Sequence, residues 1–306
     1  MEVIREEPNV FLLDKAAYRI DREPWQPEED ILKLDNMCRR RFGYPPKEEA
    51  GAQPWTIKDE KGVPNVLSLR FDIISDIDTS ASLALESRDM TEIYVNGSLV
   101  EEKASGWFVD EAIEVVRIPP LHRGNNTIEI KIPYGEKANV ENCYLLGDFG
   151  VEVYGKEKRI VSAPENIVFG DLTRQGMPFY GGNLTYRCSF FAPGGHIRLK
   201  AQYFSGPLLG VSVDHEHVGS AAFAPYEVDL GDLEEGEHLL EITAFGSRYH
   251  TFGQLHNCDK NYSWFASCSW RTKNDRWSDE YMLKELGILV TPELLYEEPF
   301  PNAERG

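Results

Sequence analysis

The chain has 306 residues, of which 42% are hydrophobic and 27% charged, and its 51 acidic and 32 basic residues give a formal charge of −19. This balance excludes nucleic acid and anionic membrane surfaces as partners, because both are bound through Lys and Arg side chains that neutralise phosphates. The length predicts about two domains.

The sequence contains no run of about 18 apolar residues that would predict a membrane span. Its first eight residues also lack the basic start and apolar core of a signal peptide. The five scattered cysteines are an odd number and are expected to be free thiols of a reducing compartment. We therefore expect a cytoplasmic protein from the sequence as written, or a secreted or cell-surface one if the chain belongs to a longer exported protein.

The first 46 residues predict a connector made of one strand and one helix. Residues 9–13 are short and apolar, which is typical of a buried strand. Residues 27–41 predict a helix, with Pro27 near its first turn, three arginines in its last turn and Gly43 after its end. The helix has an apolar stripe of Ile31, Leu34 and Cys38, which predicts that this face packs against another part of the protein.

The remaining chain predicts two β-domains of one kind in tandem, because residues 83–154 and 199–291 repeat the same order of strand-like runs. A period above about 100 residues is too long for a solenoid unit and has the size of a domain. Short strands separated by Gly, Pro and Asn indicate a sandwich or jelly roll. We expect the first sandwich over residues 47–160 and the second over 161–306.

Two short pairs mark corresponding hairpins in the repeats. Asn96 and Gly97 predict a two-residue turn, because this turn needs positive φ at both positions. Asp214 and His215 are the counterpart in the second copy.

The second copy carries an aromatic-rich insertion at about residues 247–281. Aromatic side chains flanked by Arg, Asp and His suit sugar rings, which present C–H patches and hydroxyls together. The alternative is that these aromatics pack the insertion onto the protein. The candidate carbohydrate contacts are Trp264, Trp270, Arg271, Trp277 and His256 in the insertion, with Trp107 and Asp110 in the first sandwich.

Catalytic and metal motifs are missing from the sequence. His256, Cys258 and Cys268 do not complete the four ligands of a structural zinc, and His215 with His217 supply only two ligands. No Gly-x-Ser-x-Gly, P-loop or Gly-x-Gly-x-x-Gly occurs. We therefore predict no catalytic residue, no metal ligand and no cofactor.

Several runs resemble known carbohydrate-active proteins. Residues 93–97, 106–110 and 121–130 resemble the galactose-binding-like jelly roll of family 2 glycoside hydrolases. A second group of runs is similar to the C-terminal β-sandwich region of large bacterial glycoside hydrolases related to α-L-rhamnosidases, namely residues 7–14, 25–27, 251–257, 269–272 and 277–281. The resemblance implies an all-β fold of two tandem galactose-binding-like jelly-roll β-sandwiches, and jelly rolls of this kind often hold a structural Ca²⁺, whose ligands it does not identify here.

The catalytic barrel of those enzymes has no counterpart in the sequence, since such a barrel alone needs about 250 residues. Our first hypothesis is a non-catalytic carbohydrate-binding accessory region of a glycoside hydrolase system for polysaccharide degradation, with a carbohydrate and a glycoside hydrolase catalytic domain as partners. The second hypothesis is a purely structural sandwich pair that braces a catalytic domain or an oligomer. The third is a small hydrolase or lyase with its site between the sandwiches.

Overall fold

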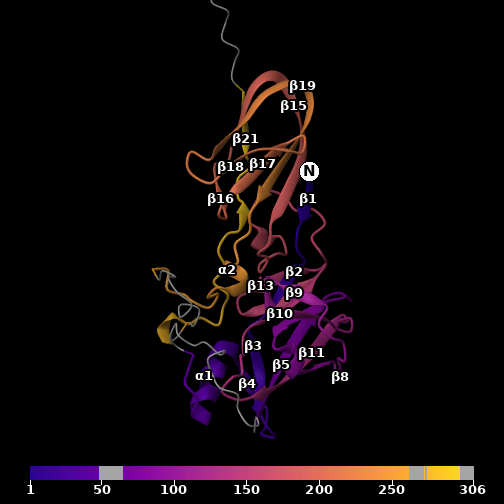
Figure 1. Cartoon of the computed structure of the whole chain (residues 1–306), viewed down its shortest axis with the longest axis vertical. Helices are drawn as coiled ribbons and strands as arrows, with labels where there is room; N and C mark the ends of the chain where they lie inside the picture. The colour runs from indigo at the N-terminus through magenta and orange to yellow at the C-terminus, as the bar shows by residue number, and fades with distance from the viewer. Residues whose placement is uncertain (48–64, 262–271, 273, 297–306) are drawn as a thin grey trace, which may run out of the picture.

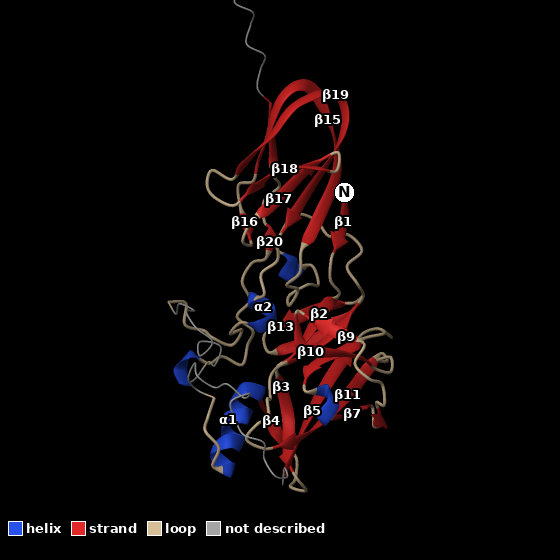
Figure 2. Ribbon diagram, in the orientation of Figure 1, coloured by secondary structure: helices blue, strands red, loops and turns tan. Residues whose placement is uncertain are grey.

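The computed structural model describes residues 1–47, 65–261, 272 and 274–296. The chain forms an all-β protein of mostly antiparallel sheets, as predicted, in two stacked units (Figures 1 and 2). No helix in the described ranges is long and apolar enough to cross a membrane.

The first unit is a sandwich of two sheets with a common core. Leu83 and Leu145 from one sheet and Phe71 and Ile128 from the other are at most 2% exposed. The five-stranded sheet has the order β2 (Asn9–Leu13), β12 (Cys143–Gly147), β6 (Ser82–Glu86), β10 (Asp110–Arg117) and β9 (Gly106–Phe108). The eight-stranded sheet has the order β13 (Gly150–Tyr154), β14 (Glu157–Val161), β5 (Asn65–Ser75), β11 (Gly124–Tyr134), β7 (Glu92–Val95) and β8 (Ser98–Leu99). Strand β3 (Lys15–Ile20) also pairs with β5, and β4 (Gln26–Asp30) pairs with β3.

In the N-terminal residues, the predicted buried strand is confirmed, and the predicted start of the helix is wrong. All five residues of β2 are buried. Helix α1 (Ile31–Phe42) begins four residues later than predicted, because residues 26–30 pair with β3 as β4 and Asp30 caps the helix by accepting from the backbone NH of Lys33. Gly43 ends the helix with a φ of 76° and the predicted stripe is buried.

The second unit is built around two long strands, β15 (Leu184–Lys200) and β19 (Glu227–Ala244). Both strands arch over at glycine positions with positive φ (Figure 1), so that Leu184 and Leu199 from opposite halves of β15 join one core. The other strands are β1 (Glu2–Arg5), β17 (Leu209–Val213), β18 (Glu216–Ala221) and β21 (Glu293–Tyr296), with the separate pair β16 (Phe204–Ser205) and β20 (Gly287–Ile288).

The strand pairing confirms the internal repeat. The order β5-β11-β7-β8 in the first unit corresponds to β15-β19-β17-β18 in the second. The pairing of β12 with β6 likewise corresponds to that of β20 with β16. The second unit therefore keeps one sheet of the repeat and reduces the other to two short strands.

The two predicted hairpin turns are confirmed and use the same hydrogen bonds. Asn96 and Asp214 both have positive φ, and each side-chain oxygen accepts from a backbone NH of the neighbouring strand, Thr127 at 2.8 Å and Leu239 at 2.9 Å. The equivalence of the copies thus extends to individual side chains.

The chain passes between the units several times. Strand β1 pairs with β15, whereas β2 lies in the first sandwich. The short helix α2 (Tyr249–Phe252) and the residues after it pack on the first unit before β20 returns to the second. The predicted domain division at residues 1–46, 47–160 and 161–306 therefore stays a proposal. The residues predicted as a connector, 1–46, contribute strands to both units. The remaining short helices are η2 (Arg88–Met90), η3 (Leu172–Arg174) and η5 (Asn274–Arg276).

Four cysteines, Cys38, Cys143, Cys188 and Cys258, are free. Cys268 lies outside the described residues.

Candidate functional site

A buried group of charged side chains fixes the insertion to the first sandwich. Lys158 on β14 donates to Asp14 Oδ1 at 2.6 Å, and the Tyr281 hydroxyl donates to the same oxygen at 2.8 Å. His256 Nε2 lies 3.0 Å from Asp14 Oδ2, and its Nδ1 lies 2.8 Å from the Ser278 carbonyl oxygen. We call Asp14, Lys158, His256 and Tyr281 the buried charge cluster.

The buried charge cluster determines the ionisation of its carboxylate. Burial alone would raise the pKa of Asp14, but the charge of Lys158 and the hydrogen bond from His256 outweigh it and hold that pKa well below its ordinary value. Both nitrogens of His256 lie within hydrogen-bond distance of an oxygen, Asp14 Oδ2 and the Ser278 carbonyl. Asp14 is therefore a paired, ionised group in the interior.

Asp30, beside this cluster, is shifted in the opposite direction. Burial and the neighbouring negative charge of Asp14 raise its pKa to about 6, although the backbone NH of Lys33 favours the ionised form. The two carboxyl groups thus differ in charge near pH 5.

The two described candidates of the insertion are engaged in packing. Trp277 stacks on His256 with ring centroids 4.4 Å apart, and Lys33 Nζ lies 3.0 Å from the centroid of the Trp277 ring. His256 is only 4% exposed. These contacts match the packing alternative for the insertion. Trp264, Trp270 and Arg271 lie outside the described residues.

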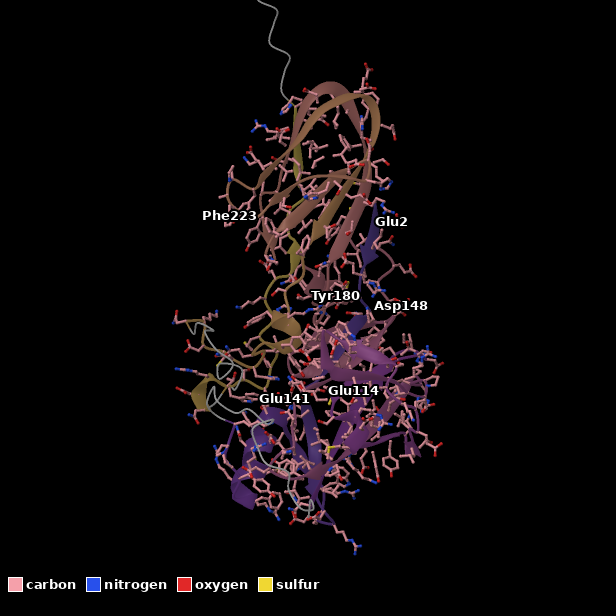
Figure 3. The ribbon with its side chains drawn as sticks, in the orientation of Figure 1. Glu2, Glu114, Glu141, Asp148, Tyr180 and Phe223 are labelled. Atoms are coloured by element: carbon pink, nitrogen blue, oxygen red, sulfur yellow. The ribbon has the colours of Figure 1, made fainter. Side chains whose placement is uncertain are left out.

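A concave site lies on the outer face of the five-stranded sheet, where that sheet meets α1 and α2. Its volume is about 360 Å³, and we call it the outer hollow. Figure 3 labels Glu141, which lies at its edge on the first sandwich. Its lining consists of Leu32, Glu86, Val109, Asp110, Ile113, Glu141, Asn142, Tyr144 and Phe252.

Polar groups converge on one side of the outer hollow. Asp110 makes a local turn by accepting from the backbone NH of Ala112 at 2.8 Å. The side-chain oxygen of Asn142 is buried without a hydrogen-bond partner. Burial raises the pKa of Glu86 above its ordinary value, against the lowering effect of the hydrogen bond that Asn139 donates. These groups could accept hydrogen bonds from ligand hydroxyls.

Two aromatic rings, Tyr144 and Phe252, also line the outer hollow. Phe252 lies edge-on to Tyr144 with ring centroids 5.6 Å apart, and the ring of Phe108, outside the lining, lies 5.5 Å from that of Tyr144. Val109, between Phe108 and Asp110, has a φ of 66°, which is rare for a β-branched residue and breaks the strand at the rim of the outer hollow.

The structure separates the two candidates of the first sandwich. Asp110 lines the outer hollow, whereas Trp107 does not. Trp107 is 58% exposed on edge strand β9 and pairs in register with Glu114, on the face opposite to Phe108.

A second concave site lies between the two sheets, and we call it the inner hollow. Its volume is about 390 Å³. Leu85 and Cys143 line it from the five-stranded sheet, and Leu69, Ile130 and Ile132 line it from the eight-stranded sheet. Glu86, the last residue of β6, and Glu141, just before β12, line both hollows.

Metal-ligating side chains do not gather in the described ranges, where no three His, Cys, Asp or Glu residues are placed to hold an ion. His215 contacts Glu241 at 3.1 Å, an ordinary surface pair.

Sequence reasoning did not identify Asp14, Lys158, Glu86 or Asn142 as site residues. The sequence separation between Asp14 and His256 is 242 positions, so no local pattern connects them.

Comparison with known proteins gives distant structural likenesses only. No protein-family model and no curated protein matches the chain. A rhamnosidase from Novosphingobium sp. PP1Y is 16% identical over 77% of this chain and 23% of its own, with a TM-score of 0.30. An α-L-rhamnosidase from Streptomyces avermitilis is 16% identical over 59% of this chain and 23% of its own, with a TM-score of 0.26. A family 2 β-galacturonidase from Eisenbergiella tayi is 6% identical over 81% of this chain and 39% of its own, with a TM-score of 0.28.

The chain thus spans less than two-fifths of the length of each of these three proteins. Likenesses of this size do not identify its activity.

Proposed function

We propose that this chain is a non-catalytic carbohydrate-binding region of a glycoside hydrolase system and that it binds sugar at the outer hollow. The observation that carries the proposal is the convergence of Asp110, Asn142 and Glu86 on a hollow with an aromatic wall. A sugar ring needs both kinds of surface at once, because it offers C–H groups on its faces and hydroxyls at its edge.

The lining also indicates which sugars would bind. Tyr144 and Phe252 would pack against the apolar face of a ring, and the oxygens of Asp110 and Asn142 would accept from its hydroxyls. The described lining contains three carboxyl groups and no Lys or Arg. We therefore expect neutral sugars to bind more tightly than uronic acids, whose carboxylates would be repelled.

The test is a glycan array with the purified chain, followed by calorimetry on each hit and product analysis of the same mixtures. Asp110→Asn keeps the shape and removes the charge, and Asp110→Ala removes the acceptor. We expect Asp110→Ala to weaken binding about tenfold, because a hydrogen bond to a charged group contributes about 1.5–3 kcal/mol. Trp107→Ala tests the other candidate of this sandwich.

The matched control is Tyr154→Ala, which removes an aromatic ring that is 87% exposed on β13. Unchanged affinity of Asp110→Ala, with Trp107→Ala losing affinity, would move the site to the opposite face. Turnover of a bound glycan would indicate a hydrolase or lyase.

A second candidate function, bracing of a catalytic domain or oligomer, is favoured by the packing of Trp277 and His256. Both side chains connect the insertion to the first sandwich. This hypothesis predicts that Trp277→Ala destabilises the protein, and that no glycan on the array binds.

A further inference from the structure

The inner hollow has no role in the proposed sugar contacts, and its chemistry differs from that of the outer hollow. Its wall is aliphatic over both sheets, with Leu69, Leu85, Ile130, Ile132 and Val140 among its residues, and no aromatic ring lines it in the described ranges. A wall of this kind accommodates a flexible alkyl chain without selecting a flat ring.

Polar side chains also line the inner hollow, among them Glu86, Asn139 and Glu141. Lys47 donates to Asn139, and Asn139 donates to Glu86, so hydrogen bonds hold Glu86 in place at the end of β6. Glu86 and Glu141 also line the outer hollow. A ligand that occupies both hollows would therefore contact the two glutamates between its polar and apolar parts.

We propose that the ligand is a sugar bearing an aliphatic substituent, with the sugar in the outer hollow and the alkyl chain in the inner hollow. This inference rests on the proposed function for its sugar half. The alkyl half has a separate basis, because burial of each methylene group contributes about 0.8 kcal/mol, which is about a fourfold gain in affinity. A volume of about 390 Å³ is in the range of sites that bind small organic molecules.

The substituent could come from an acyl group on a glycan or from the chain of a glycolipid. Both present the same chemistry to the inner hollow. The alkyl chain length at which the affinity stops rising distinguishes these two sources. A hollow that fits a short acyl group holds roughly two to four carbons, and one that fits a lipid chain holds more.

The experiment is a titration of the full chain, labelled with ¹³C at its methionine methyls, with methyl, butyl, hexyl and octyl β-glucosides and with butanol, hexanol and octanol, all below micelle formation. Met90 lines the inner hollow and reports on it directly. Met177 is 0% exposed in the core of the second unit and serves as an internal control. We expect the Met90 signal to shift, the Met177 signal to stay, and affinity to rise about fourfold per methylene.

A filling variant tests the location. Ala138 lines the inner hollow and is partly buried, so Ala138→Phe should abolish the chain-length dependence. Ala222→Phe is the matched control, because Ala222 is partly buried in the second unit, between β18 and β19. Thermal unfolding establishes that both variants fold, and Met90→Ala, monitored by calorimetry, provides a second change in the hollow.

The outcomes separate the two proposals. If methyl glucoside binds and the longer alkyl glucosides bind no tighter than it does, the inference is overturned and the proposed function stands. The inference is also overturned if the alcohols bind and each glucoside binds no tighter than the alcohol with the same chain. In that case the two hollows do not share a ligand. The absence of any chain-length effect, or its persistence in Ala138→Phe, would refute the inner hollow as the binding site.

Discussion

Replacement of Lys158 by Met should release the insertion from the first sandwich. Lys158 is the cation of the buried charge cluster, and its ammonium lies 2.6 Å from Asp14 Oδ1. The side chains of Asp14 and Lys158 are only 4% and 14% exposed. Lys158→Met keeps the length of the side chain and removes its charge, so the buried carboxyl group of Asp14 would keep only His256 and Tyr281 as partners.

The expected loss is about 3 kcal/mol, the low end of the range of about 3–5 kcal/mol for breaking a buried ion pair, because two donors to Asp14 remain. A loss of this size increases the opening equilibrium about 150-fold. Hydrogen exchange measured by mass spectrometry should therefore accelerate about 150-fold in peptides that cover residues 253–258 and 278–284, and much less in β5 and β11.

The matched control is Lys131→Met, which breaks an ion pair at the surface. Lys131 Nζ lies 3.3 Å from Glu92, whose side chain is 61% exposed, and such a pair contributes at most about 1 kcal/mol. The double variant Asp14→Asn with Lys158→Met should cost less than the sum of the single changes, by about 1 kcal/mol or more. Equal losses for Lys158→Met and Lys131→Met, or additive single changes, would refute the reasoning.

Three further changes test other parts of the structure. Burial raises the pKa of Asp30 to about 6. Between about pH 4 and 6 the carboxyl group of Asp30 therefore stays protonated in the folded state and is ionised in the unfolded chain, so the stability of the fold decreases as the pH rises through this window. Asp30→Asn should remove this fall and raise stability at pH 8 by up to about 3 kcal/mol in urea unfolding, and an unchanged pH profile would contradict it. Gly246→Ala would place Cβ at 2.1 Å from the Gly181 carbonyl oxygen and 2.2 Å from that of Gly182, and should cost about 3 kcal/mol in thermal unfolding, whereas Gly106→Ala, with no atom within 4 Å, should cost less than about 1 kcal/mol. Trp277→Leu should cost about 2 kcal/mol in urea and leave glycan affinity unchanged, and a loss of affinity without a loss of stability would restore Trp277 as a sugar contact.

Local signals predicted the elements that depend on local chemistry. The turn at Asn96 and Gly97 forms because these residues tolerate positive φ, and the C-terminus of α1 follows from Gly43. The start of α1 could not be predicted in this way, because Pro27 and its neighbours are drawn into β4 by pairing with β3. Tertiary pairing there outweighs a helical pattern that is favourable by itself.

The candidate site shows the same limit. Aromatic composition drew attention to Trp277, but its role depends on His256 on one face and Lys33 on the other. Asp110 was a sequence candidate, yet the groups beside it come from α1, α2 and β12, which are distant in the chain. The sequence therefore indicated residue types suitable for a sugar, but of the described candidates only Asp110 lines the outer hollow.

The repeated passage of the chain between the units has a mechanical consequence. Two domains joined by a single linker can rotate relative to one another. In this protein the described part of the chain crosses the junction four times: between β1 and β2, after β14, after β19 and before β20. Near the junction (Figure 3), the Tyr180 hydroxyl donates to the Asn183 carbonyl oxygen and Arg248 pairs with Glu7. Torque applied to one sandwich is then shared among four chain crossings, so the pair should transmit load as one rigid body. Neither half is complete as one continuous segment, because β1 of the second unit precedes the first sandwich and the insertion that packs on the first sandwich follows β19.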